Sequence, residues 1–375
     1  MSQYGPSTRA VRAGQPEARD EAPFLPGPTF AASYHLRGDP SEHADVYGRY
    51  DNPTWRGLED AIGALEGGHA LVFASGMAAA AAVLLECSEP GRPAVLPSDG
   101  YPAVRAIARD YLGPRGVPVR FVATDQEAIL EALPEAGLVW VETPSNPRLD
   151  VVDIAQVARA ASEVGALLVV DNTLATPLGQ LPLGLGADLV VASGSKHLCG
   201  HSDLVLGYAV ARDPAGIERL HAWRTLAGAI PGPFEAWLAH RSLATLEVRL
   251  QRQCGNASAL AELLAGREEV SKVRYPGLAA DPSHALARTQ MRVFGSVLGF
   301  ALPDAEWAQR FLDRADLVIQ ATSFGGVHTT AERRARWRTD DVPDGFIRLS
   351  AGIENTEDLL ADVTRALDAA NMKGC

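Results

Sequence analysis

The chain has 375 residues, of which 47% are hydrophobic and 21% are charged, and its formal net charge is −12. A chain of this length can bury a large core and is long enough for two domains. The acidic balance argues against a general binder of nucleic acids or anionic membranes, and no run of roughly 18 apolar residues predicts a membrane span.

The cysteines and the N-terminal sequence bear on the compartment. The four cysteines are Cys87, Cys199, Cys254 and Cys375, and their wide spacing matches neither a disulfide scaffold nor a metal cluster. We therefore predict free thiols, a cytoplasmic location and no bound metal. The N-terminal segment lacks the apolar stretch of a signal peptide, so we expect none.

Residues 1–45 carry scattered proline, glycine and charge, without a helical or strand pattern. We expect an extended arm, and such an arm needs a surface to lie on. Another copy of the chain is a natural one. The alternative is a frayed terminus.

The next part of the chain alternates between apolar runs and helical patterns. The run 70–74 predicts a strand, and the alanine-rich stretch 77–86 predicts a helix. Four Val- and Leu-rich runs without alternation predict strands covered on both faces, at 138–142, 166–171, 188–193 and 204–210. Between two of them, Asp153 can cap a helix that Gly165 ends. Such repetition indicates an α/β domain with a mostly parallel sheet.

The pattern changes after about residue 235, at the Pro-Gly-Pro turn 231–233. A long helix is predicted over 236–253, a strand at 296–302 and an amphipathic helix at 355–370. We therefore expect three parts: an N-terminal arm at 1–45, a large domain at 46–235 and a small C-terminal domain at 236–375.

Two of the predicted strands end near residues that suit an aldehyde cofactor. Asp171 closes one apolar run, and Lys196 follows the next one, 25 residues later. In a doubly wound sheet both lie at the carboxyl ends of strands, where ligands bind. The lysine amine can condense with the aldehyde of pyridoxal 5′-phosphate (PLP), and a carboxylate can keep the pyridine nitrogen protonated. The alternative for the lysine is a solvated surface position.

Small and hydroxyl-bearing residues nearby suit a phosphate. The sequence Ser75-Gly76-Met77 lies between a strand and a helix, where backbone N–H groups can approach an anion. Ser193 and Ser195 flank the lysine position and offer hydroxyl donors. The alternative is an ordinary turn and cap.

The segment ETPSNP (142–147) forms a stiff loop directly after a predicted strand. Asn146 can then hydrogen-bond the cofactor's phenolic oxygen or the substrate carboxylate. The alternative is a rigid turn in which asparagine is a turn former.

These residues belong to a larger set of motifs that spans nearly the whole chain, from TRAVRAGQ (8–15) to RLSAGIE (348–354). Between them come YGRYDNPT (47–54), FASGMAA (73–79), ETPSNP (142–147), VDNTLATP (170–177), SGSKHLCGHSD (193–203) and SFGG (323–326). In this order they resemble the Cys/Met metabolism family of PLP enzymes, which includes cystathionine γ-lyase, cystathionine γ-synthase and methionine γ-lyase. The resemblance implies the PLP-dependent transferase fold of the aspartate aminotransferase type (fold type I), with a large parallel-sheet domain and a smaller α/β domain.

The resemblance also implies roles for residues around the cofactor. Lys196 matches the lysine that binds PLP as a Schiff base, and Asp171 matches the partner of the pyridine nitrogen. Four residues match the phosphate site: Gly76, Met77, Ser193 and Ser195.

Further matches concern the ring, the neighbouring subunit and the substrate. Tyr101 matches the tyrosine that stacks on the cofactor ring and assists as acid or base. Tyr47 and Arg49 match a motif that completes the phosphate site of a neighbouring subunit, which implies a homotetramer made of two catalytic dimers. Arg348 matches the arginine that pairs with the substrate's α-carboxylate, and Ser323 is implied to bind substrate.

The chain departs from the family pattern where the substrate's distal end would lie. Pro102, Ala103 and Val104 replace the usual Gly-Gly-Thr, and His328 stands where glutamate is common. Methionine γ-lyases usually carry a cysteine just after the stacking tyrosine, and this chain has Pro102 and Ala103 there, so we expect γ-elimination of L-cystathionine. Arg105 and His328 are candidates for its distal carboxylate, and the alternative is that both are surface charges.

Other activities remain open. Methionine γ-lyase and cystathionine γ-synthase activity would use the same cofactor residues. A non-catalytic ligand-binding module is a further alternative, but the first strand lacks the Gly-x-Gly-x-x-Gly fingerprint of a dinucleotide site.

Overall fold

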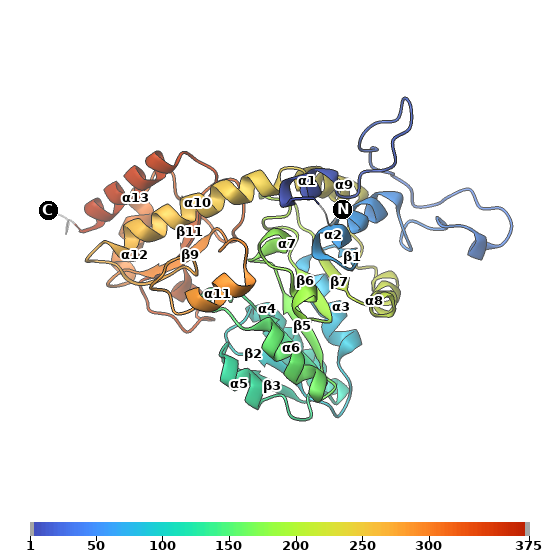
Figure 1. The fold of residues 1–375 in the computed structure, drawn as a ribbon, viewed down its shortest axis with the longest axis horizontal. Coiled ribbons are helices and arrows are strands. Elements are labelled where there is room, and N and C mark those ends of the chain that lie inside the picture. Colours follow the sequence, from blue (N-terminus) through green and yellow to red (C-terminus); the bar gives the residue numbers. More distant parts are fainter. Residues whose placement is uncertain (1–3, 372–375) are drawn as a thin grey trace.

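The computed structural model describes residues 4–371 and contains two β-sheets with helices packed against them (Figure 1). The larger sheet has the strand order β1-β7-β6-β5-β4-β2-β3. Its strands are β1 (His69–Phe73), β2 (Ala94–Pro97), β3 (Val119–Val122), β4 (Leu138–Glu142), β5 (Leu167–Asp171), β6 (Leu189–Ala192) and β7 (Gly207–Ala211). Strand β7 runs antiparallel to both of its neighbours, and the other pairs are parallel. The predicted α/β fold with a mostly parallel sheet is confirmed.

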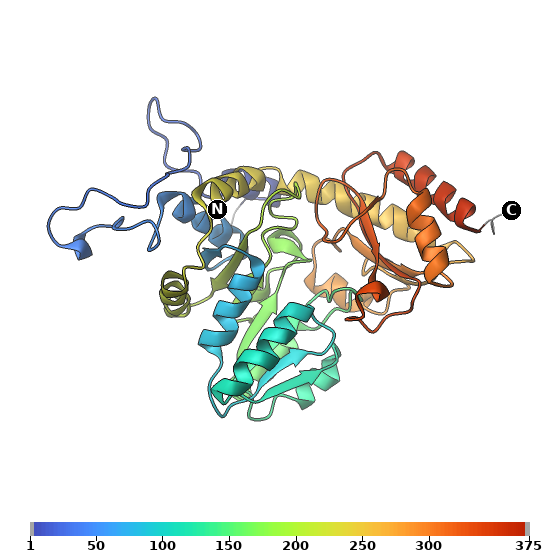
Figure 2. The same cartoon turned by 180° about the vertical axis from the view of Figure 1, so that it is seen from behind.

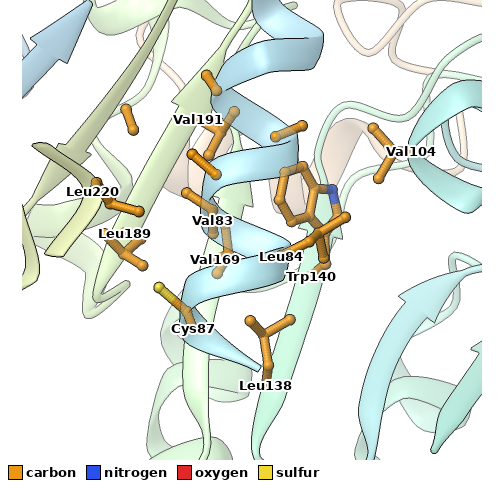
Figure 3. Close-up of a cluster of buried hydrophobic side chains, with 14 of the residues drawn as sticks. Val83, Leu84, Cys87, Val104, Leu138, Trp140, Val169, Leu189, Val191 and Leu220 are labelled. Carbon is orange, nitrogen blue, oxygen red and sulfur yellow. The ribbon is translucent and has the colours of Figure 1, made fainter. Parts of the chain in front are cut away.

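Helices cover the larger sheet: α2 (Pro53–Glu66), α3 (Gly76–Cys87), α4 (Pro102–Ile107), α5 (Gln126–Glu131), α6 (Ile154–Glu163), α7 (Thr176–Gly179), α8 (Pro214–Ala227) and α9 (Pro233–Leu243). Figure 3 shows how α3 meets the sheet, where Val83 and Leu84 pack beside Trp140 and Val169. The alanines of α3 have high helix propensity and little bulk, so the helix can lie close to the strands. This packing fixes the N-terminus of α3 at the carboxyl edge of the sheet.

The predicted start and stop of α6 are both present. The side chain of Asp153 accepts a hydrogen bond from the backbone N–H of Gln156 at 2.9 Å, which satisfies one of the free donors of the first turn. Gly165 ends the helical segment with a φ of 66°, a conformation that glycine adopts without steric cost.

The smaller sheet has the order β10-β11-β12-β9-β8. Its strands are β8 (Ser271–Arg274), β9 (Val297–Ala301), β10 (Ile319–Gln320), β11 (Thr330–Arg333) and β12 (Phe346–Ser350). The helices of this part are α10 (Leu246–Ala265), α11 (His284–Gln290), α12 (Ala305–Arg314) and α13 (Thr356–Asn371). Figures 1 and 2 show α10 running from α9 toward the second sheet. Leu250 packs with the core beside the larger sheet and Ala257 with the core of the smaller one, so one helix joins both parts.

Three expectations about local structure need correction. The single helix expected over 236–253 is two helices, because α9 ends at Leu243 and α10 begins at Leu246. The hydroxyl of Thr245 donates to the carbonyl of Ser242 at 3.1 Å, a local bond that competes with helical pairing. The strand expected from residue 204 begins only at Gly207, because Leu206 pairs with Ser195 instead.

The third correction concerns the N-terminal segment, which contains the helix α1 (Pro6–Arg12). Arg9 donates to the carbonyl of Ala64 at 2.8 Å and Ala10 is buried, so tertiary packing supplies what the local pattern lacks. The following residues, up to about residue 50, loop away from both sheets (Figures 1 and 2).

Residues 4–371 include three of the four cysteines. Cys87, Cys199 and Cys254 are free thiols, and Cys375 lies outside the described residues. In this same range no helix combines the length and the apolar character needed to cross a bilayer.

Candidate active site

A cavity of about 670 Å³ opens at the carboxyl edge of the larger sheet, facing the smaller sheet. Strands β4 and β5 pair so that Glu142 lies opposite Asp171, and Lys196 sits in the turn after β6. Ten of the twelve predicted site residues line this one cavity: Gly76, Met77, Tyr101, Asn146, Asp171, Ser193, Ser195, Lys196, Ser323 and Arg348. Segments far apart in the sequence therefore converge as the strand ends predict.

One end of the cavity has the features of an anion site. The N-terminus of α3 opens into it, with Ser75 capping the helix by accepting from the N–H of Ala78 at 3.0 Å. A Cβ atom on Gly76 would lie 2.9 Å from the Cβ of Ser193, so only glycine lets the helix approach the end of β6. The first N–H groups of the helix remain free for an anion.

The two predicted serine donors differ in their present partners. The backbone N–H of Ser193 donates to Thr173 Oγ1 at 2.9 Å, and Ser193 lines the cavity. The hydroxyl of Ser195 is 3.1 Å from the carbonyl and 2.9 Å from the N–H of Leu206. To donate to a phosphate, Ser195 must therefore turn its proton away from Leu206.

The two buried carboxyl groups at the sheet edge are costly to keep ionised. Burial raises the pKa of Asp171, an effect that the bond to Thr173 and the charge of Lys196 oppose. Burial, and next the charge of Asp171, raise the pKa of Glu142 well above its usual range. A cation placed against Asp171 would offset the cost of keeping it ionised, and a protonated pyridine nitrogen is such a group.

Lys196 lines the same cavity and is affected by the charges of both Asp171 and Arg348. Burial and the nearby charge of Arg348 lower its pKa, while Asp171 opposes this. Its ammonium group lies 5.4 Å from the centre of the Phe324 ring. A lysine with a lowered pKa is neutral more of the time, which a nucleophile or base requires.

Arg348, on β12, lines the cavity and is held in place by three hydrogen-bond partners. It donates to Asn146 Oδ1 at 2.7 Å, to the carbonyl of Ser323 at 3.0 Å and to Glu332 Oε1 at 2.6 Å. Burial, and next the charge of Arg334, lower its pKa to about 10, so the guanidinium stays charged at neutral pH. A fixed, buried guanidinium of this kind suits a carboxylate.

Tyr101 borders the cavity at the start of α4, with 46% of its surface exposed. Its backbone N–H donates to Glu142 Oε2 at 2.9 Å, which fixes the start of the helix. Its ring can therefore cover a flat ligand that lies over the strand ends.

Two predicted site residues and one further candidate lie elsewhere. Tyr47 and Arg49 do not line the cavity of their own chain, and Arg49 donates to the carbonyl of Thr225 at 2.6 Å. Arg105 was expected to reach the distal end of the substrate, but it donates to the carbonyls of Ser98 at 2.7 Å and Thr339 at 2.9 Å. The Arg105 guanidinium therefore joins two backbone segments, and of the two candidates for the distal carboxylate only His328 is among the residues that line the cavity.

Some site residues were missed. Glu142 belongs to the motif ETPSNP and Thr173 to the motif VDNTLATP, but the motifs alone do not assign them a role. Glu142 closes the apolar run 138–142 and Thr173 follows the run 166–171 by two residues, so both reach the sheet edge and line the cavity. Glu332 fixes Arg348 and also accepts from Arg334, Trp337 and Arg336. No local pattern identifies it, since its role depends on strand β11 pairing with β12.

The cavity thus fits a flat cationic ring that carries a phosphate and an aldehyde. The N-terminus of α3 suits the phosphate, Asp171 suits the ring nitrogen, and Lys196, which lines the same cavity, suits the aldehyde. These features agree with the cofactor that the motifs imply.

Comparison with known proteins identifies the family. The model of the Cys/Met metabolism PLP-dependent enzymes matches residues 7–368. A protein of Streptomyces coelicolor, named provisionally as a cystathionine gamma-lyase, is 54% identical over 97% of this chain and 94% of its own length.

Solved structures agree. The apo structure of CalE6, a methionine gamma lyase from Micromonospora echinospora, has a TM-score of 0.91 at 38% identity and covers 98% of this chain and 100% of that one. Cystathionine gamma synthase from Xanthomonas oryzae pv. oryzae, in complex with cystathionine, has a TM-score of 0.93 at 36% identity and covers 98% of both chains. The chain therefore belongs to the Cys/Met metabolism family of PLP-dependent enzymes, which are lyases and synthases that act on sulfur amino acids.

Proposed function

We propose that the enzyme cleaves L-cystathionine by γ-elimination, giving L-cysteine, 2-oxobutanoate and ammonia. The observation that carries this proposal is that one cavity is lined by Lys196, Asp171 and Arg348 and also by His328. Arg348 suits the carboxylate of the reacting amino acid, and His328 suits the polar head at the other end of cystathionine. The similarity to the Streptomyces coelicolor protein supports the same activity.

The cofactor contacts follow from the site. Lys196 would hold PLP, Asp171 would pair with its ring nitrogen, and Tyr101 would stack on the ring. The start of α3 at Gly76 and Met77 would receive the phosphate, together with Ser193 and Ser195. When bound, PLP withdraws electrons from the substrate's Cα and so stabilises negative charge there.

The chain's own residues then move the protons. The Lys196 amine would hold PLP until substrate binds and would then take the proton from the substrate's Cα. A second proton leaves Cβ, and the sulfur departs from Cγ, with Tyr101 placed to act as acid or base. Arg348 and Asn146 hold the carboxylate so that the Cα–H bond stays within reach of Lys196. With one water consumed, the overall reaction would give L-cysteine, 2-oxobutanoate and ammonia.

Substrate preference tests this proposal. We expect kcat/KM for L-cystathionine to exceed that for L-methionine by at least tenfold, about 1.4 kcal/mol in transition-state free energy. The products 2-oxobutanoate, cysteine and ammonia should form in equal amounts. Cystathionine formed from cysteine and O-succinylhomoserine as the dominant product would identify a γ-synthase instead, and a tenfold preference for methionine would identify a methionine γ-lyase.

His328 provides a sharper test of the distal contact. We expect His328→Ala to lower kcat/KM for cystathionine while changing that for methionine little, because methionine has no second polar head. His69→Ala, at an exposed position on β1, is the matched control. Equal losses for both substrates would contradict the distal role.

We also propose that active sites are shared between subunits of a homotetramer. The segment between about residues 14 and 50 extends away from both sheets (Figures 1 and 2) and exposes Phe24 at 94% and Phe30 at 73%. Arg49 lies 5.7 Å from the Tyr47 ring centre and 5.1 Å from that of Tyr50. The exposed apolar surface of Phe24 and Phe30 favours burial of this segment against another copy of the chain. Burial there would carry Tyr47 and Arg49 to the phosphate site of that copy.

Arg49→Ala should therefore weaken PLP retention without unfolding the protein, because the phosphate loses a charge-assisted contact. The measurement is the PLP content of the purified enzyme after dialysis, with Arg19→Ala, an exposed change in the same segment, as control. Full PLP retention by Arg49→Ala, or a fully active monomer, would contradict shared sites.

A further inference from the structure

Helix α10 carries three buried polar side chains on one face. Arg249 is 5% exposed, and Gln253 and Asn256 are fully buried. Their spacing of four and three residues places them in one row along the helix. We call this row the α10 stripe. Buried polar groups are costly unless they are hydrogen-bonded, so the partners of the stripe show what it does.

The first member of the stripe holds the turn that follows Lys196. Arg249 donates to the carbonyl of His197 at 2.7 Å and to that of Leu198 at 3.2 Å. It also donates to the carbonyl of Ser242 at 3.0 Å and to the hydroxyl of Thr245 at 3.1 Å. Within residues 4–371 no carboxylate forms an ion pair with Arg249, so uncharged oxygens stabilise its charge. A Cβ atom on Gly200 would lie 1.9 Å from Arg249 Nη1, so glycine makes this close approach possible.

The other two members hold the segments around the substrate end. Gln253 donates to the carbonyl of Gly326 at 2.7 Å, three residues after Ser323. Asn256 donates to the carbonyls of Gly352 at 3.0 Å and Glu354 at 2.9 Å, directly after the strand that carries Arg348.

The three segments are also joined to one another. The N–H of Val327 donates to the carbonyl of Gly200, and the N–H of Ile353 donates to the carbonyl of Val327, both at 2.9 Å. The stripe therefore spans a continuous layer of backbone that links the Lys196 turn to the end of β12. Because α10 packs into both cores, it can set the distance between them.

We propose that the α10 stripe is a positioning element that keeps Lys196 and Arg348 in register across the two sheets. Arg249 sets the position of Lys196, and Asn256 sets that of Arg348. This inference rests on the proposed function in taking Lys196 as the cofactor lysine and Arg348 as the carboxylate partner.

Two readouts of the holoenzyme separate the two ends of the stripe. The visible absorption of the bound cofactor reports displacement of Lys196 by an added amine. L-norvaline has an amine and a carboxylate but no leaving group on Cγ, and n-butylamine is the same molecule without the carboxylate. The rate at which n-butylamine displaces Lys196 reports on the position of Lys196. The ratio of the dissociation constants of n-butylamine and L-norvaline reports on how well Arg348 binds the carboxylate.

We expect Arg249→Met to slow displacement by both amines about tenfold and to leave the preference for norvaline unchanged. Asn256→Asp should lower that preference about tenfold and leave the n-butylamine rate unchanged, because aspartate cannot donate to the two carbonyls. Arg252→Met changes an exposed arginine on the same helix and should alter neither readout.

The inference is overturned if each variant moves both readouts together, as general loosening would, or if neither variant moves its own readout. If Arg249→Met or Asn256→Asp does not fold, Arg249→Lys and Asn256→Ala replace them, with the same pattern expected at about threefold. A wild-type enzyme that shows no preference for norvaline would instead contradict the role proposed for Arg348, which distinguishes failure of the proposed function from failure of the stripe.

Discussion

Replacing Lys196 by alanine should lower kcat by more than about 10⁴-fold with any sulfur amino acid, because one amine serves as both attachment point and base. Lys196 lines the same cavity as Asp171 and Arg348. Burial and the charge of Arg348 lower its pKa, which increases the fraction of the neutral amine that can take a proton. The visible absorption of the attached cofactor should disappear together with turnover.

Lys272→Ala is a matched control for this variant. The sequence has only three lysines, Lys196, Lys272 and Lys373, and Lys272 lies exposed on β8 of the smaller sheet. Its replacement should leave both kcat and the absorption spectrum unchanged. Substantial turnover by Lys196→Ala, measured with the cofactor present in excess, would contradict the assigned role.

Asp171→Asn should lower kcat by about 10²- to 10³-fold at saturating PLP, because a neutral amide no longer favours a protonated ring nitrogen. The fold should survive, since an asparagine oxygen can still accept the bond that Asp171 Oδ1 receives from the N–H of Thr173 at 3.0 Å. Burial already raises the pKa of Asp171, so an apoenzyme without the cationic ring should lose little stability on this change.

The control is Asp153→Asn, the same chemical change at the cap of α6, where asparagine caps a helix about as well as aspartate. It should leave kcat unchanged. A kcat for Asp171→Asn within tenfold of wild type, with full cofactor occupancy, would show that the carboxylate is not needed at the ring nitrogen.

The sheet and its edge were predictable because their signals are local. Apolar runs identified β4, β5 and β6 within one or two residues, and each of these strands leads directly to a side chain of the site. Parallel pairing then brings Asn146, Asp171 and Lys196 to the same edge, whatever the intervening loops do. Motifs added the start of α3 and the distant Arg348.

What the sequence did not reveal depends on contacts between distant segments. Arg105 appeared free to bind substrate, but its guanidinium joins the carbonyls of Ser98 and Thr339. Glu332 fixes Arg348 only because β11 pairs with β12. The break between α9 and α10 contains no glycine or proline that would predict it from the sequence. It coincides with the hydrogen bond from the Thr245 hydroxyl to the carbonyl of Ser242. Such features need the folded arrangement before they can be assigned.

The most direct test of the account is the site of cofactor attachment. The holoenzyme would be reduced with borohydride and digested, and the peptide carrying the pyridoxyl group would be identified by mass spectrometry. The account predicts the label on Lys196 and its loss in Lys196→Ala. A label on Lys272 or Lys373, or retention of the label in Lys196→Ala, would contradict it.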